Sequence, residues 1–122
     1  MKKFFAASMA VAVSLTAFSA LAADDGEKAF KACKACHKLD KNATGPMLGG
    51  VVGRAAGTAE GFAYSDAVKN SGITWTEENL AKWLDKSAGG PKAMIPGTKM
   101  AFAGLKKPED IKAVIEYIKS AH

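Results

Sequence analysis

The stretch Cys33-Lys34-Ala35-Cys36-His37 decides how this chain folds. It reads Cys-x-x-Cys-His, which is the pattern of c-type haem attachment. Two thiols three residues apart lie within one helical turn, so both are able to add to the vinyl groups of one porphyrin. The histidine after the second thiol is then placed to bind the iron. The motif predicts one covalent haem c with its iron, attached through Cys33 and Cys36, with His37 as an axial ligand.

Three other uses of the two cysteines stay open at the level of the motif. A thioredoxin-like redox site normally joins a strand to a helix, and the sequence shows no such alternation. A zinc site needs four ligands, whereas the chain has two cysteines and two histidines. A disulfide would close an unusually small loop. The rest of the chain favours haem.

Residues 1–22 have the pattern of a cleaved secretory signal peptide, which predicts a periplasmic protein. Lys2 and Lys3 precede an uncharged stretch over 4–21, and Ala20-Leu21-Ala22 is a cleavage site of the A-x-A type. The alternative is an uncleaved membrane anchor, for which the stretch is long enough. Cleavage would leave one domain over 23–122, and loss of two lysines would lower the net charge from +5 to +3.

The composition of the remaining 100 residues limits the possible functions. Both cysteines belong to the motif, so no disulfide is left to stabilise a small secreted domain. An attached porphyrin would supply the missing apolar centre. The lysines are scattered rather than gathered in runs with aromatic residues, which argues against a nucleic-acid partner.

Apolar spacing predicts three main helices, over about 25–36, 76–86 and 108–120, and no strands. Leu80, Trp83 and Leu84 form one stripe, and Ile111, Val114, Ile115 and Ile118 form another. The stretch 39–71 is rich in glycine and is expected to be loop, with one short helical turn near 66–70. Residues 87–91 are expected to end the second helix. The predicted class is all-α, with short turns and long loops wrapped round one covalent haem.

The second iron ligand is left open by the spacing alone. The candidates are Met47, Met94, Met100 and His122. Met100 is favoured, because the Pro-Gly sequence before it predicts a shaped loop that would carry the thioether over the far haem face. A methionine is, however, more often a core residue than a ligand.

Taken together, the motifs resemble those of the class I cytochromes c, small His/Met carriers of bacterial periplasm and mitochondria. The resemblance covers nearly all of the chain after the leader and follows one order. Its motifs are Gly26-x-x-x-Phe30, the Cys33–His37 stretch, Thr44-Gly45-Pro46, the run from Gly61 to Ala67, Gly72-Ile73-Thr74-Trp75, and the run from Ile95 to Gly104.

The resemblance implies a role for each matching residue. Cys33 and Cys36 match the thioether cysteines, His37 the proximal ligand and Met100 the distal ligand. Pro46 matches the residue whose carbonyl accepts the other ring N–H of the histidine, a bond that fixes the tautomer.

Three more residues match groups that hold the buried haem propionates. These are Arg54, Tyr64 and Trp75. Pairing is physically required there, because a buried carboxylate needs a partner. Ordinary surface charge and core packing are the alternatives for Arg54 and Trp75. Residues 87–90 look longer than in short relatives and are interpreted as a surface insertion.

Two positions depart from the family pattern, and one contact is implied by it. Trp83 stands where many relatives have tyrosine, and Val68 where many have asparagine, which leaves the hydrogen bonding of the pocket open. Gly26 and Phe30 match the face of the first helix that packs on the last helix, near Tyr117.

The expected function is one-electron transport, not enzyme catalysis. Iron held by histidine and thioether has no free position, and the soft sulfur favours the ferrous state. Four lysines near the Met100 loop are expected to steer acidic redox partners to the haem edge; they are Lys92, Lys99, Lys106 and Lys107. The expected partners of this monomer are a membrane cytochrome bc complex and a terminal oxidase, reductase or reaction centre, met only transiently. The alternative is a haem peroxidase or gas sensor with Met100 displaced from iron.

Overall fold

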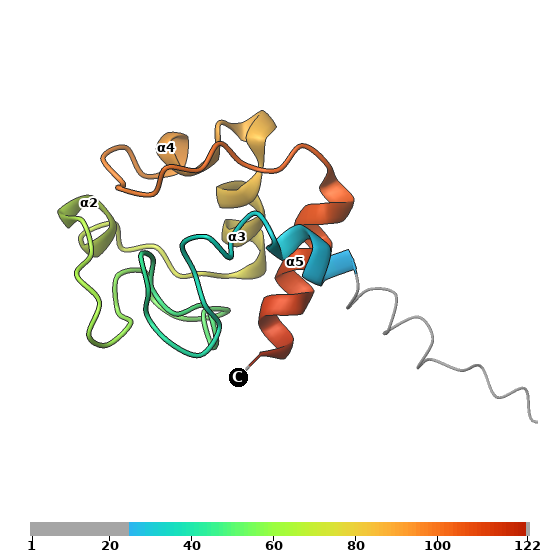
Figure 1. The fold of residues 1–122 in the computed structure, drawn as a ribbon. Coiled ribbons are helices and arrows are strands. Elements are labelled where there is room, and N and C mark those ends of the chain that lie inside the picture. The colour runs from blue at the N-terminus through green and yellow to red at the C-terminus, as the bar shows by residue number, and fades with distance from the viewer. Residues whose placement is uncertain (1–24, 122) are drawn as a thin grey trace, which may run out of the picture.

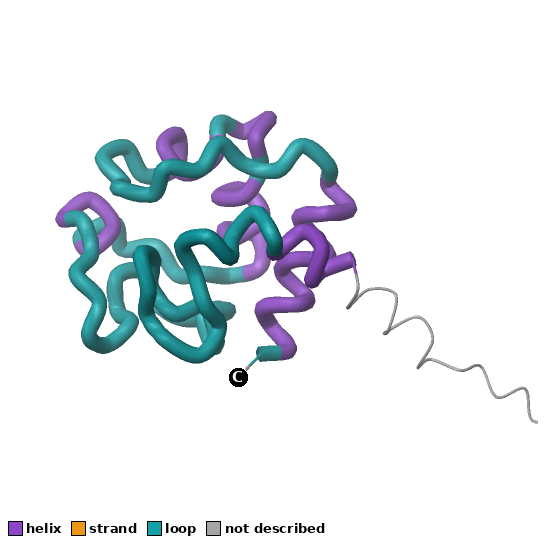
Figure 2. Tube along the Cα trace, in the orientation of Figure 1, coloured by secondary structure: helices purple, strands orange, loops and turns teal. Residues whose placement is uncertain are grey.

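The computed structural model describes residues 25–121, and every regular element in that range is a helix (Figure 1 and Figure 2). Residues 25–30 are helical. They are followed by α2 (Asp66–Lys69), α3 (Glu77–Leu84), the 3₁₀ turn η1 (Lys86–Ala88), α4 (Gly90–Met94) and α5 (Pro108–Ser120). This confirms the predicted all-α class and the short helix near 66–70. The predicted signal peptide lies outside the described residues.

The first helix packs across the C-terminal helix α5 through a glycine. A Cβ built on Gly26 would meet the Ala113 carbonyl oxygen and the Tyr117 Cβ, each at 2.6 Å. Next to this crossing the Phe30 and Tyr117 rings lie 5.3 Å apart, centroid to centroid. The contact implied by the family resemblance is therefore present, and glycine is what lets the two backbones approach so closely.

The helices α3 and α5 are each buried along one stripe. Leu80, Trp83 and Leu84 are the buried residues of α3, whose first turn is capped by the Thr76 side chain accepting from Asn79 N–H. In α5 the buried residues are the predicted four, Ile111, Val114, Ile115 and Ile118. Both stripes join one core with Phe30, Val51, Trp75 and Ile95. Burial of these side chains fixes the two helices against one another.

The first two of the main predicted helices are too long, and the helix at 90–94 was missed. The first was expected to run to about residue 36, but the helix covers 25–30 and residues 31–36 form turns. We expected the second helix to run to about residue 86, but α3 ends at Leu84 because Leu105 N–H donates to the Leu84 carbonyl at 2.6 Å. We expected Pro91 to terminate helix, yet it occupies the first turn of α4, where its missing N–H costs nothing. The interpretation of 87–90 as a surface insertion is wrong at Gly90, which is buried.

Long irregular segments occupy the rest of the molecule. In Figure 2 the loops before α2 lie at the bottom of the view and lead into α2, whereas the loop between α4 and α5 crosses the top and leads into α5. The only ladder-like contacts in the described range are the single bridges Ala55–Thr74 and Asp85–Leu105. Within the same range, no helix is long and apolar enough to cross a membrane.

Candidate functional site

The Cys33–His37 motif lies on the turns that continue the first helix. Cys33 N–H donates to the Phe30 carbonyl at 2.8 Å, and His37 N–H donates to the Cys33 carbonyl at 2.8 Å. Both cysteines are free thiols, Cys33 half-buried and Cys36 exposed. Burial raises the pKa of the Cys33 thiol, and the neighbouring Cys36 raises it further. The motif thus presents two unbridged thiols and one histidine from a single turn.

The His37 imidazole is buried and held from one side. Its Nδ1 lies 2.8 Å from the Pro46 carbonyl oxygen. A carbonyl only accepts, so Nδ1 carries the proton and the lone pair of Nε2 is left for a metal. The Cys36 carbonyl accepts from Gly45 N–H at 2.7 Å. A Cβ on Gly45 would overlap the imidazole, so the Gly45-Pro46 segment is packed directly on the ring.

Met100 leaves a tightly defined turn. Thr98 N–H donates to the Ile95 carbonyl at 3.1 Å, and Gly97 has a φ of 92°, a value that suits the third position of a type II turn after proline. The Thr98 hydroxyl then accepts from Met100 N–H at 3.2 Å. The Met100 side chain is half-buried against the core. The loop therefore fixes the backbone at Met100, from which this side chain extends.

The other candidates for the second ligand are placed less favourably or are not described. Met94 closes the short helix α4. Met47 lines a cavity with Arg54. His122 lies outside the described residues.

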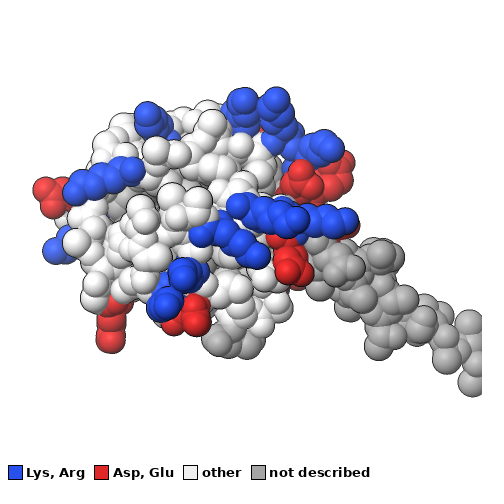
Figure 3. Space-filling model, viewed as in Figure 1, with Lys and Arg blue, Asp and Glu red and all other residues white. Residues whose placement is uncertain are grey.

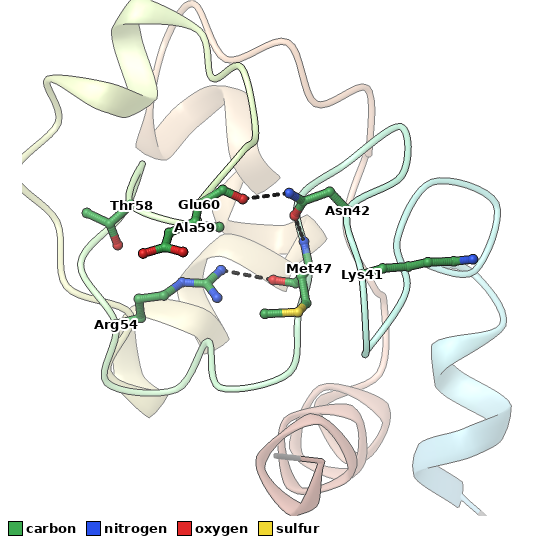
Figure 4. Close-up of a pocket in the computed structure, with 7 residues that line it drawn as sticks. All are labelled: Lys41, Asn42, Met47, Arg54, Thr58, Ala59 and Glu60. Carbon is green, nitrogen blue, oxygen red and sulfur yellow. Dashed lines mark hydrogen bonds between the residues drawn. The ribbon is translucent and has the colours of Figure 1, made fainter.

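Arg54 lies in a cavity of about 490 Å³ (Figure 4). One guanidinium nitrogen, Nη2, donates to the Met47 carbonyl at 3.0 Å. The Arg54 Nε, in contrast, is buried and has no partner in the described part of the protein. A buried donor without an acceptor is costly. The cavity is lined by Lys41, Asn42, Met47, Arg54, Thr58, Ala59 and Glu60.

Tyr64 and Trp75 are brought to the same region by the backbone. Trp75 N–H donates to the Arg54 carbonyl at 2.8 Å, and the Trp75 carbonyl accepts from Gly53 N–H at 2.7 Å. The Tyr64 hydroxyl accepts from Ala59 N–H at 3.0 Å, which leaves its own proton to donate. The arrangement fits a haem propionate, because it combines an unpaired buried guanidinium N–H with a free phenolic O–H.

Sequence reasoning missed Asn42, which ties together two sides of the cavity. Its amide donates to the Glu60 carbonyl at 2.8 Å and accepts from Met47 N–H at 2.9 Å. No spacing in the sequence points to Asn42, because its partners are backbone atoms of distant turns.

The two positions that depart from the family pattern are both near the core. Trp83 is buried and meets Trp75 edge to face, with centroids 4.9 Å apart. Val68 is half-buried against the same core. Each therefore contributes packing where many relatives have a polar side chain.

Charged side chains lie around the edge of one face of the molecule. In Figure 3, lysine and arginine side chains surround a largely uncharged central area. The four lysines named for partner steering, Lys92, Lys99, Lys106 and Lys107, are all exposed. Their positions leave them accessible to another macromolecule.

Comparison with known proteins gives consistent matches over the described residues. The family model described as Cytochrome c matches residues 23–122. Cytochrome c2 of Blastochloris viridis is 48% identical over 122 residues, covering 98% of this chain and 93% of that protein. Cytochrome c2 iso-2 of Magnetospirillum molischianum is 53% identical over 98 residues, covering 79% and 97%.

A solved structure agrees with the fold. Cytochrome cH from Methylobacterium extorquens superposes with a TM-score of 0.74 at 49% identity, covering 80% of this chain and 97% of that one.

Proposed function

Because the chain belongs to the cytochrome c family and carries electrons on a haem c, we propose a role for each residue of the site. Cys33 and Cys36 form the two thioether bonds to the porphyrin. His37 and Met100 are the two axial ligands of the iron. The haem supplies a one-electron couple between ferrous and ferric iron.

The observation that carries this proposal is the hydrogen bond from His37 Nδ1 to the Pro46 carbonyl at 2.8 Å. It holds the proton on Nδ1 and directs Nε2 at the metal. It also increases the electron density on the ring, which strengthens the ligand. A histidine that is buried only for packing needs no fixed tautomer. Here the tautomer is fixed, and the histidine directly follows two unbridged cysteines.

Met100 supplies the opposite ligand through its thioether. The turn at 95–98 and the bond from Met100 N–H to the Thr98 hydroxyl hold the backbone at Met100 without the metal. A loop already formed would keep Met100 near the metal in either oxidation state, so little of the protein would have to rearrange on electron transfer. The soft sulfur and the apolar core around it both favour the ferrous state.

Arg54, Tyr64 and Trp75 hold the propionates away from water. Arg54 Nε has no acceptor of its own, and a carboxylate beside it would remove this deficit. Tyr64 donates its hydroxyl proton, since its oxygen already accepts from Ala59 N–H. Trp75 is bonded to Arg54 through the backbone, and its indole N–H would be a further donor to the propionates.

The protein is an electron-transfer protein and not an enzyme, as its cytochrome c2 relatives indicate. The alternative of a haem peroxidase or gas sensor is not supported. We propose that it exchanges electrons with a membrane cytochrome bc complex and a terminal oxidase, reductase or reaction centre, as a monomer in transient contact. The predicted leader over 1–22 would direct it to the periplasm.

Peptide mass spectrometry of the purified protein tests the attachment. The peptide that contains Cys33 and Cys36 is expected to carry the mass of one haem, and neither cysteine is expected to react with a thiol reagent. Free thiols in the coloured protein would contradict the assignment.

Stopped-flow kinetics test the lysine surface. The rate of electron transfer to an acidic redox partner is expected to fall as ionic strength rises, because screening weakens the attraction of Lys92, Lys99, Lys106 and Lys107. Neutralising Lys99 and Lys106 to glutamine should flatten that dependence, whereas the same change at Lys119, paired with Glu77 on another face, should not. A rate that does not change with salt would show that these lysines do not steer the partner.

A further inference from the structure

A groove of about 500 Å³ runs between α3 and α5, apart from the haem site. Its floor is formed by apolar residues, Ala81 of α3 with Ile111 and Ile115 of α5. The inward stripe of α3, Leu80, Trp83 and Leu84, is buried in the core against which Met100 packs. The groove therefore opens on the opposite side of α3 from the residues assigned to the haem.

The rim of this groove is acidic on a chain that is otherwise basic. Four carboxylates line it, Glu77, Glu78, Asp85 and Glu116, against two lysines, Lys82 and Lys112. Because Lys119 is paired with Glu77, the rim carries a net charge of −1, four carboxylates against three lysines, on a chain whose residues 23–122 total +3. A surface with this excess of negative charge favours cationic side chains over anionic groups.

The groove is held open by the packing of its walls. The Lys119 ammonium lies 3.3 Å from the Glu77 carboxylate and so links α5 to α3. A wall of eight residues, the length of α3, extends over about 12 Å, which matches two to three turns of an incoming helix.

We propose that this groove binds a basic amphipathic helix of a protein partner. Small apolar side chains of that helix would rest on Ala81, which is half-buried, and its lysines or arginines would meet Glu78 and Glu116. This is the helix-in-groove mode of recognition. Because the groove lies across α3 from the haem site, a partner bound there leaves the Met100 side free to exchange electrons while the carrier stays tethered.

An NMR titration of the reduced holoprotein tests this proposal. The probe is a synthetic peptide of two Lys-Leu-Ala-Lys-Leu-Ala-Lys repeats, and the control peptide has glutamate in place of every lysine. The basic peptide is expected to shift the amide signals of Ala81, Lys82 and Ile115 in a saturable way and to leave that of Met100 unchanged. The acidic peptide is expected not to shift the groove signals.

A matched pair of variants decides whether the rim is responsible. Glu78→Gln with Glu116→Gln should weaken peptide binding about two- to thirtyfold, because two exposed ion pairs are lost. Glu27→Gln with Asp40→Asn removes the same charge from exposed positions outside the groove and should leave binding unchanged. Both pairs lie on the surface, so the fold is retained.

The remaining outcomes overturn the proposal. A change of less than twofold in the first variant, or equal weakening in both, would show general charge attraction. Concentration-dependent shifts of the groove signals without peptide would assign the groove to a second copy of the chain, and shifts with anionic vesicles would assign it to a membrane. None of these readouts depends on the redox activity, so failure here is distinct from failure of the proposed function.

Discussion

Replacing Gly45 by alanine tests how the histidine is held. Gly45 does not have a positive φ. Alanine can therefore adopt its backbone conformation without strain. Its Cβ would lie 2.6 Å from His37 Nδ1 and 2.7 Å from His37 Nε2. Contacts so short force the ring and the Gly45-Pro46 segment apart, which weakens the bond to Pro46.

The expected cost follows from this crowding. Overpacking of a filled interior typically costs about 1–3 kcal/mol, and the loss of chain entropy in the unfolded state returns about 0.4–1 kcal/mol. A net loss of about 1–2 kcal/mol would lower the melting temperature by about 4–8 °C per kcal/mol in a domain of this size. Guanidinium unfolding of the ferric holoprotein, followed by circular dichroism, measures the change.

Gly26→Ala is the matched control. The added Cβ there would lie equally close to its neighbours, at 2.6 Å from the Ala113 carbonyl oxygen, but it would touch no proposed ligand. Both variants should lose stability, whereas only Gly45→Ala should also change the reduction potential and the Soret spectrum. If Gly45→Ala is as stable as the unchanged protein, or if the two variants have the same spectrum, the reasoning about His37 is refuted.

Three further changes address Arg54, Asp85 and Met100. Arg54→Leu removes a positive charge beside the proposed propionate, and potentiometry should record a reduction potential lower by on the order of 50 mV; an unchanged value would contradict the pairing. Ser87→Ala should raise the pKa of Asp85, which hydrogen bonds from the Ser87 hydroxyl and N–H now hold below its usual range. A lowered pKa stabilises the fold above the unfolded-state value, so the variant should be less stable above about pH 4 and the difference should vanish as the pH falls through the folded-state pKa; a difference that grows in acid would contradict this. Thr98→Val removes the acceptor of Met100 N–H and should cost about 0.5–1.5 kcal/mol, seen as earlier loss of the sulfur-to-iron band in urea; Thr98→Ser should restore it, and failure of serine to do so would exclude the hydroxyl.

Strong amphipathic periodicity made α3 and α5 predictable. Their stripes, such as Leu80-Trp83-Leu84, occupy the interior as expected. The helix α4 was missed because Gly89-Gly90-Pro91 reads as a break, and five residues are too few to show a period. Gly90 is fixed instead by a distant contact, since a Cβ there would lie 2.9 Å from the Ala103 carbonyl oxygen.

The residues of the site also differ in how far the sequence could predict them. The motif gave His37 directly, because attachment depends on local spacing. Arg54 and Trp75 are joined by a backbone hydrogen bond across about twenty residues, and no local sequence pattern predicts such a bond. Only the family resemblance pointed to these two residues as propionate ligands. Asn42 had neither signal, since its two bonds go to backbone atoms.

The near-infrared absorption of the ferric protein addresses the central claim most directly, which is that a sulfur atom from Met100 occupies one side of the iron and imidazole the other. The account predicts the weak sulfur-to-iron band in the native protein, its loss in Met100→Ala, and no uptake of carbon monoxide by the native ferrous form. A native spectrum without that band, or one that persists after Met100 is replaced, would contradict it.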